Sequence, residues 1–200
     1  MKVLIAFECS GIVREAFRAK GHDAWSCDLK PAEDGSKYHK RGDVSWNVEF
    51  LADSEYQFDL IIAHPPCTHI ALCGNRHYAG TEQRRLATEL IRRVWNFPVY
   101  RLCIENPMGQ INTYLPEMPK PQLIHPWQFG HREMKVTGLW KRNLPDLIPT
   151  DVVGPPPPKG SEERKEWEKV FRMAPSPERA TNRARTYRGI GQAMADQWTL

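Results

Sequence analysis

The sequence lacks an apolar run that approaches the ~20 residues a helix needs to cross a lipid bilayer. Its five cysteines are few, odd in number and scattered, which does not fit the disulfide framework of a secreted domain. It contains no repeat, collagen-like stretch or disorder-promoting composition. Its short apolar start is not followed by a signal-peptide cleavage site. These absences predict a soluble cytoplasmic protein with reduced thiols and no contact with a membrane.

A strong net charge is absent as well, because 28 Lys and Arg residues face 24 Asp and Glu, which gives +4. The charge is uneven: residues 1–60 carry 8 basic and 11 acidic side chains, whereas residues 61–200 carry 20 and 13. A basic C-terminal portion is typical of nucleic-acid binding and equally of an ordinary solvated surface. The length of 200 residues suits one compact domain with a hydrophobic core.

Short apolar runs alternate with helical patterns along the chain. The apolar runs predict strands over 2–7, 24–27, 58–63 and 100–104, and a looser alternation predicts another over 135–140. Periodic apolar residues predict helices over 12–20, from 81 onward, over 161–169 on the surface, and at the C-terminal end. Strands that alternate with helices of this length predict a parallel α/β sheet.

Two polar features follow the first two predicted strands, at the strand ends where doubly wound sheets bind ligands. The turn over residues 7–11 leads into a helix, so backbone N–H groups lie beside a bound ligand. Asp28 closes the second strand, 17 residues after Gly11, where a carboxylate accepts hydrogen bonds from ribose hydroxyls. Each feature is weak alone, and together they favour a nucleoside-type cofactor.

Two further strands end in residues that can carry chemistry. Pro65 and Pro66 fix the backbone, so the thiol of Cys67 is held rigidly and is a candidate nucleophile. The alternative is a small buried structural cysteine, which is the interpretation given to Cys9, Cys27, Cys73 and Cys103. Glu105 follows the next strand. Burial of a carboxylate there is costly unless the group has a function, such as hydrogen bonding to a ring nitrogen of a ligand or protonating it. A salt bridge or a helix cap is the alternative for Glu105.

A metal site is the other possibility near Cys67. His64, Cys67, His69, Cys73 and His77 fall within 14 residues. Structural zinc sites use two ligand pairs that are well separated in sequence, and a second pair is missing, so we expect no metal. The three histidines are then predicted to be ordinary surface or loop residues, with proton transfer or phosphate contact as the alternative.

The motifs, in this order along the chain, resemble those of the cytosine-C5 DNA methyltransferases. They are Phe7-x-x-x-Gly11, Asp28, Pro65-Pro66-Cys67 and Glu105-Asn106-Pro107. Gly42-Asp43 is similar to the family's acidic contact to the adenine of S-adenosylmethionine, and residues 189–194 are similar to its last motif. The chain also looks like short phage- and prophage-encoded relatives, which would place it in a host cytoplasm. The resemblance covers residues 1–110 well and 185–198 loosely.

The resemblance implies an α/β, Rossmann-like class I methyltransferase fold with a mostly parallel doubly wound sheet and a reduced or absent target-recognition domain. It implies S-adenosyl-L-methionine as cofactor, bound by Phe7, Glu8, Ser10, Gly11, Asp28, Asp43, Pro65 and Gln192. It implies that the Cys67 thiolate adds to C6 of cytosine while Glu105 hydrogen-bonds N3 and the exocyclic amine. C5 then attacks the methyl group of the cofactor.

Substrate contacts are the least specific part of the resemblance. They are assigned to Pro66, Asn106, Lys135 and Thr137. Lys135 and Thr137 would replace the family's Arg-x-Arg motif, which has no clear match; Arg183-Ala-Arg185 has the spacing but lies close to the C-terminal end.

Residues 1–200 are predicted to form a single methyltransferase-like domain, in which 141–181 is a Pro-rich, charged insertion in place of a target-recognition domain. DNA is the expected partner, together with a protein that supplies sequence recognition. One alternative is the same chemistry on RNA or a free cytidine nucleotide. Another is an inactive module that binds nucleic acid or a partner. N-methylation ranks last, because Cys67 stands where those enzymes have an aromatic residue.

Overall fold

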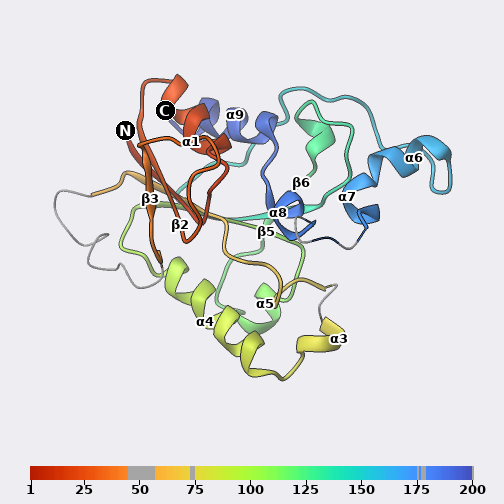
Figure 1. Cartoon of the computed structure of the whole chain (residues 1–200), viewed down its shortest axis with the longest axis horizontal. Helices are drawn as coiled ribbons and strands as arrows, with labels where there is room; N and C mark the ends of the chain where they lie inside the picture. Colours follow the sequence, from red (N-terminus) through yellow and green to blue (C-terminus); the bar gives the residue numbers. More distant parts are fainter. Residues whose placement is uncertain (45–56, 73–74, 175, 177–178, 200) are drawn as a thin grey trace.

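One mixed sheet organises the residues that the structure describes, which are 1–44, 57–72, 75–174, 176 and 179–199 of this computed structural model (Figure 1). Its strands are β1 (Lys2–Ala6), β2 (Asp23–Asp28), β3 (His39–Arg41), β4 (Leu60–Ala63), β5 (Arg101–Pro107), β6 (Gln122–Ile124) and β7 (Thr137–Arg142). The strand order is β3-β2-β1-β4-β5-β7-β6. The chain therefore runs outward from β1 in one direction and from β4 in the other.

The strand directions confirm the predicted doubly wound, mostly parallel sheet. β1 pairs in parallel with β2 and β4, β2 with β3, and β4 with β5. β7 is reversed and pairs antiparallel with both β5 and β6. The switch in winding direction lies between β1 and β4, and ligands bind at such a point, outside the carboxyl ends of the strands.

Helices cover both faces of the sheet (Figure 1). One face packs against α1 (Ile12–Ala19) and α9 (Arg188–Gln197), the other against α4 (Glu82–Trp95) and the short α5 (Ile111–Tyr114). Alternate residues of β1 serve the two cores, since Val3 and Ile5 pack on the α1 side and Leu4 on the α4 side. This two-residue alternation within a continuous apolar run is what a strand buried on both faces requires.

The predicted helices are largely confirmed. α4 begins one residue after Thr81, whose hydroxyl accepts a hydrogen bond from the Arg84 N–H as an N-cap. The predicted surface helix over 161–169 is α6 (Glu162–Trp167), followed by α7 (Lys169–Arg172), although Trp167 is buried. The remaining short helices are α3 (Asn75–Tyr78), α8 (Arg179–Ala184) and the 3-10 turn η3 (Pro126–Gln128).

The strand boundaries correct two predictions. β5 does not end at Ile104 but continues through Pro107, because β7 pairs alongside it and places Leu139 opposite Glu105. Glu105 therefore lies within the strand. The strand expected over 135–140 begins only at Thr137, so Lys135 precedes it. Within the described residues, no helix is both long enough and apolar enough to cross a membrane.

Candidate active site

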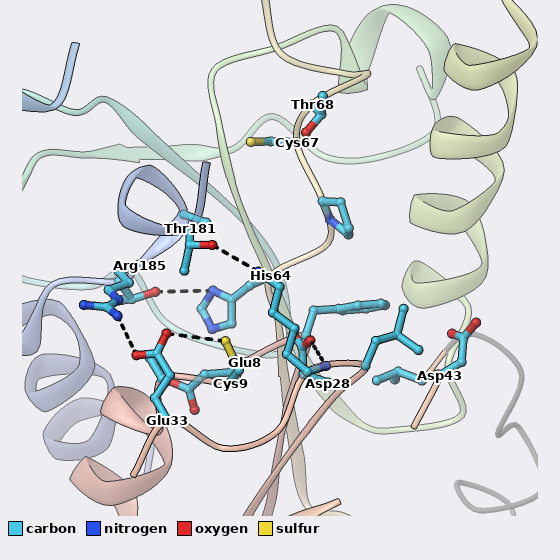
Figure 2. Close-up of a pocket in the computed structure, with 18 of the residues that line it drawn as sticks. Glu8, Cys9, Asp28, Glu33, Asp43, His64, Cys67, Thr68, Thr181 and Arg185 are labelled. Carbon is cyan, nitrogen blue, oxygen red and sulfur yellow. Dashed lines mark hydrogen bonds and ion pairs between the residues drawn. The ribbon is translucent and has the colours of Figure 1, made fainter. Parts of the chain in front are cut away.

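A cavity of about 460 Å³ opens at the carboxyl ends of β1, β2 and β4 (Figure 2). Of the predicted cofactor residues, Phe7, Glu8, Ser10, Asp28 and Asp43 line it. Pro66 and Cys67 line it as well. Figure 2 shows Cys67 and Thr68 on one side of His64, and Glu8, Cys9 and Glu33 on the other. The sequence motifs from separate strand ends thus meet at one site.

The turn after β1 is fixed by the side chain of Glu8. Its carboxylate is buried and accepts hydrogen bonds from the backbone N–H groups of Val13 at 2.8 Å and Arg14 at 3.3 Å. These are donors of the first turn of α1 that have no partner within the helix, so Glu8 caps the helix. Gly11 does not line the cavity. Its φ is +74°, and a side chain at this position would meet the Arg14 guanidinium, so glycine is favoured here.

A buried arginine supports the next part of the cavity wall. Arg14 is 0% exposed, donates to Ser26 Oγ at 2.7 Å and forms an ion pair with Asp34. Ser26 Oγ also contacts His39 Nδ1 at 2.9 Å, on β3. The network joins α1, β2 and β3 to the 29–36 segment, which carries Lys30 into the cavity.

The ends of β2 and β3 bring acidic groups to the cavity. Asp28 Oδ1 accepts the backbone N–H of Lys30 at 2.8 Å, and the Gly42 N–H donates to the Asp28 carbonyl at 2.9 Å. The second bond places Asp43 on the same wall. Such carboxylates suit the hydroxyl and amino groups of a nucleoside.

The position of Cys9 contradicts the prediction that it is a buried structural cysteine. It is half-buried and lines the cavity, with Sγ 3.8 Å from Glu33 Oε1, so it is not a buried structural cysteine. Burial and then the charge of Asp28 raise the pKa of its thiol. Cys27 and Cys103 are buried as expected, and burial raises the pKa of Cys27 to about 11. Cys73 lies outside the described residues.

A segment near the C-terminal end, missed by the sequence analysis, closes the cavity. Its lining residues are Thr181, Ala184, Arg185 and Thr186. Arg185 Nη2 lies 2.6 Å from Glu33 Oε2, and Lys30 Nζ donates to Thr181 Oγ1 at 3.0 Å. The partners are about 150 positions apart, and no local pattern marks them. The only sequence signal was the Arg-x-Arg spacing that ends at Arg185.

The carboxylate of Glu105 is buried and paired. It is 6% exposed, and Oε2 accepts hydrogen bonds from His64 Nδ1 at 2.5 Å and Thr186 Oγ1 at 3.1 Å. Burial alone would raise the pKa of Glu105, but the hydrogen bond and charge of His64 outweigh it and lower that pKa to about 2. Burial would lower the pKa of His64, yet Glu105 raises it above its usual value. His64 is therefore not the surface or loop histidine that we predicted.

Cys67 is held at the cavity by the turn that follows β4. Asn106, buried at the end of β5, donates from Nδ2 to the Pro65 carbonyl at 2.8 Å. The backbone N–H groups of Ile70 and Ala71 donate to the Cys67 carbonyl at 3.0 and 2.9 Å. Because β4 and β5 are neighbours, these bonds fix the thiol-bearing turn against the strand that carries Glu105.

Several predicted residues do not line the cavity. They are Gly11, Pro65, Glu105, Asn106, Lys135, Thr137 and Gln192. Lys135 is close enough to Glu105 for its charge to lower the pKa of that carboxyl, and it donates to the Arg185 carbonyl at 3.2 Å. Gln192 is exposed on α9 and donates to Asp196 Oδ1 at 3.1 Å, so the structure does not bring it to the site. Over the described part of the chain, no three His, Cys, Asp or Glu side chains are grouped to hold a metal ion.

Among the solved structures that resemble this fold are the following two. One is a protein provisionally described as a DNA modification methyltransferase encoded within a prophage of E. coli, with a TM-score of 0.52, 14% identity and coverage of 74% of this chain and 50% of that one. The other is the S. pombe Dnmt2 methyltransferase, with a TM-score of 0.45, 20% identity and coverage of 70% and 48%.

The chain spans about half the length of both structures. No family model and no curated protein match the chain. At these identities the first likeness shows the fold, which is the Rossmann-like class I methyltransferase fold.

Proposed function

We propose that this chain transfers a methyl group from S-adenosyl-L-methionine to C5 of cytosine in DNA through a covalent adduct between Cys67 and C6. The observation that carries the proposal is the arrangement at two neighbouring strand ends. Cys67 follows β4, Glu105 lies in β5 with its carboxylate paired to His64, and Cys67 and His64 line a cavity at the switch point of the sheet. The methyltransferase fold supports the same conclusion.

The residues around the cavity fit the cofactor. Its volume of about 460 Å³ falls within the range of small-molecule sites. Asp28 would accept the ribose hydroxyls and Asp43 the adenine amino group, while Glu8 and Glu33 supply negative charge near a cationic ligand. The cofactor would supply an electrophilic methyl group attached to a sulfonium. Gln192 faces away and is left out of this assignment.

Cys67 and Glu105 divide the chemistry on the base. Cytosine C5 is a poor nucleophile, and addition of the Cys67 thiolate to C6 makes it part of an enamine. Glu105 hydrogen-bonds N3 and the exocyclic amine and assists protonation of N3 as negative charge develops there. A water molecule or another base removes the C5 proton, and the thiolate then leaves. In duplex DNA the target base would have to be flipped out of the stack.

A second candidate is the same chemistry on RNA or a free cytidine nucleotide. It is favoured by the small size of the 141–181 segment, which we predict to stand where a target-recognition domain would lie. Salt separates the two candidates, because an enzyme that neutralises several phosphates loses affinity steeply as salt rises.

The test is methyl transfer from labelled S-adenosylmethionine to duplex DNA, single-stranded DNA, transfer RNA and cytidine nucleotides, with the products identified by mass spectrometry. We expect 5-methylcytosine in DNA, and its loss in Cys67→Ser. Cys27→Ser is the matched control, because Cys27 does not line the cavity. Transfer that survives in Cys67→Ser would overturn the covalent mechanism. Binding of nucleic acid without any transfer would instead favour the inactive module.

A further inference from the structure

We propose that His64 relays a proton between the cavity and Glu105, so that Glu105 can protonate N3 of the target base. His64 would act through Glu105 and is a positioning and proton-supplying residue of the site. The inference rests on the proposed function.

The geometry of the pair gives the first argument. His64 directly follows β4 and Glu105 lies in β5, and the Nδ1–H of His64 donates to Oε2 of Glu105 at 2.5 Å. The Thr186 hydroxyl donates to the same oxygen at 3.1 Å and lies 3.4 Å from His64 Nδ1. No hydrogen bond from the described residues ends on Oε1 of Glu105. Oε2 is thus held by the protein, and in the proposal Oε1 is the oxygen that would meet the base.

The second ring nitrogen of His64 gives the next argument. The His64 side chain is only 10% exposed, and its Nε2 is buried without a hydrogen-bond partner among the described residues. A buried polar nitrogen in this state is costly, which indicates a partner that enters the site. His64 also lines the cavity (Figure 2). The imidazole therefore lies between the cavity, which His64 lines, and Glu105, to which Nδ1 donates.

Charged groups on the surrounding elements keep a proton on the pair. Glu8 after β1 and Glu105 in β5 both favour the charged imidazole. Burial and Lys135, which precedes β7, oppose it, and Thr186 adds a neutral hydroxyl. The carboxylates prevail, since the pKa of His64 is raised and that of Glu105 is lowered. The hydrogen bond and charge shared by the two groups thus favour the proton on His64 over the proton on Glu105.

The proposed reaction needs that proton. When the bond between the Cys67 sulfur and C6 forms, the C5=C6 electron pair moves to C4–C5 and the C4=N3 pair moves to N3. N3 takes a proton from Glu105, and Glu105 takes one from Nδ1 of His64. When the thiolate leaves, the electrons return to the ring and the N3 proton goes back by the same route. The C5 proton leaves separately to water. A Glu105 carboxylate without this supply can accept a hydrogen bond from the exocyclic amine but has no proton for N3.

The test is the pH dependence of single-turnover methyl transfer in the wild type and in His64→Gln. Glutamine keeps a hydrogen bond to Glu105 but cannot carry a proton. Because general acid catalysis contributes roughly 10²–10⁴-fold, we expect a rate loss of about 100-fold near pH 7. We also expect the optimum to move to lower pH, where Glu105 itself becomes protonated. Cofactor affinity, measured by calorimetry, should change less than about threefold. His22→Gln, before β2 and outside the cavity lining, is the control.

A purely structural role for His64 predicts another result, because it lowers the rate at every pH and leaves the shape of the profile unchanged. That outcome would overturn the relay while the methyl transfer of the wild type upholds the proposed function. Absence of transfer by the wild type would overturn both. ¹⁵N NMR of the imidazole tests the pair without activity: His64 should titrate at a higher pKa in the wild type than in Glu105→Gln. Equal pKa values would also overturn the relay.

Discussion

The two walls of the cavity are held in different ways. The wall formed by the turn after β1 and the 29–36 segment depends on buried groups, namely the carboxylate of Glu8 and the guanidinium of Arg14. The opposite wall, residues 181–186, has a buried attachment from Thr186 to Glu105 and an exposed one through Arg185 and Glu33, whose side chains are 45% and 33% exposed. Buried hydrogen bonds to charged groups are strong, whereas exposed ion pairs contribute about 0–1 kcal/mol and weaken with salt. We therefore expect the exposed Arg185–Glu33 pair, and not the buried groups of the first wall, to open when a ligand is released.

Removal of the buried Arg14 guanidinium, which supports the first wall, should have the largest effect on stability. We expect Arg14→Met to lower the free energy of unfolding by about 3 kcal/mol, because Asp34 and Ser26 lose their shared buried partner. Denaturant unfolding measures the change. Lys20→Met on the same helix is the control, since its ion pair with Asp196 is exposed. Equal unfolding midpoints for the two variants would contradict the buried anchor.

The contribution of the His64–Glu105 pair to stability should depend on pH. The pKa of Glu105 is lowered in the folded state, so its stabilisation is present above the unfolded value of 4.5 and is lost as pH falls toward 2. The pKa of His64 is raised, so its contribution is present at low pH and is lost as pH rises through that raised pKa. We expect roughly 2 kcal/mol of acid-side loss in the wild type.

This pH dependence can be checked by thermal unfolding across pH with two glutamine variants. Glu105→Gln should remove the part of the acid-side loss that comes from the carboxylate, because glutamine does not titrate, and it should reverse the contribution of His64, because burial then lowers the pKa of the imidazole. Glu163→Gln, an exposed carboxylate on α6, should leave the profile as it is. A Glu105→Gln protein with the wild-type acid limb would show that other carboxylates govern the acid-side loss.

Glycine at position 11 offers a finer comparison within the first wall. Gly11 and Gly21 both have positive φ, +74° and +82°, but only a Cβ at Gly11 would contact Arg14. Gly21→Ala measures the backbone cost alone, about 1 kcal/mol. We expect Gly11→Ala to cost about 1 kcal/mol more and to weaken cofactor binding, as measured by chemical unfolding and calorimetry. Equal costs would mean that Arg14 moves aside freely.

The smallest change in stability is expected at the second wall. Arg185→Gln should alter the free energy of unfolding by less than about 1 kcal/mol, yet it should speed cofactor dissociation severalfold. Stopped-flow kinetics at rising salt gives the check. Dissociation from the wild type should accelerate with salt, and dissociation from the variant should not. A salt effect of the same size in both proteins would argue against an ionic attachment.

The part of the fold that follows from local apolar pattern was predictable. The continuous apolar run of β1 and the periodic apolar residues of α4 were enough to predict a strand and a helix at these positions. β3 and β6 were missed, because three residues such as His39–Arg41 carry no pattern until a neighbour pairs with them. The extension of β5 past Ile104 likewise depends on its pairing with β7.

The candidate site also contains some residues that local sequence predicts and some contacts that it does not. Residues placed by the strand that precedes them, such as Asp28 and Cys67, were located from sequence. The bond between His64 and Glu105 depends on the register of β4 against β5, and the contact of Arg185 with Glu33 depends on how a distant segment returns. Neither contact produces a periodic pattern or a fixed spacing that can be recognised in a single sequence. The burial that makes His64 a partner of Glu105 is a property of the assembled sheet.

The helix cap supplied by Glu8 has a consequence for ligand choice. In many nucleotide-binding folds the exposed N–H groups at the start of the first helix attract a phosphate. Here the carboxylate of Glu8 already accepts the N–H groups of Val13 and Arg14. A phosphorylated nucleotide would meet a resident negative charge at this point, whereas a nucleoside that bears a cationic sulfur or ammonium group would meet an attractive one. We therefore expect the turn after β1 to favour a cationic nucleoside over dinucleotides and triphosphates through its electrostatics.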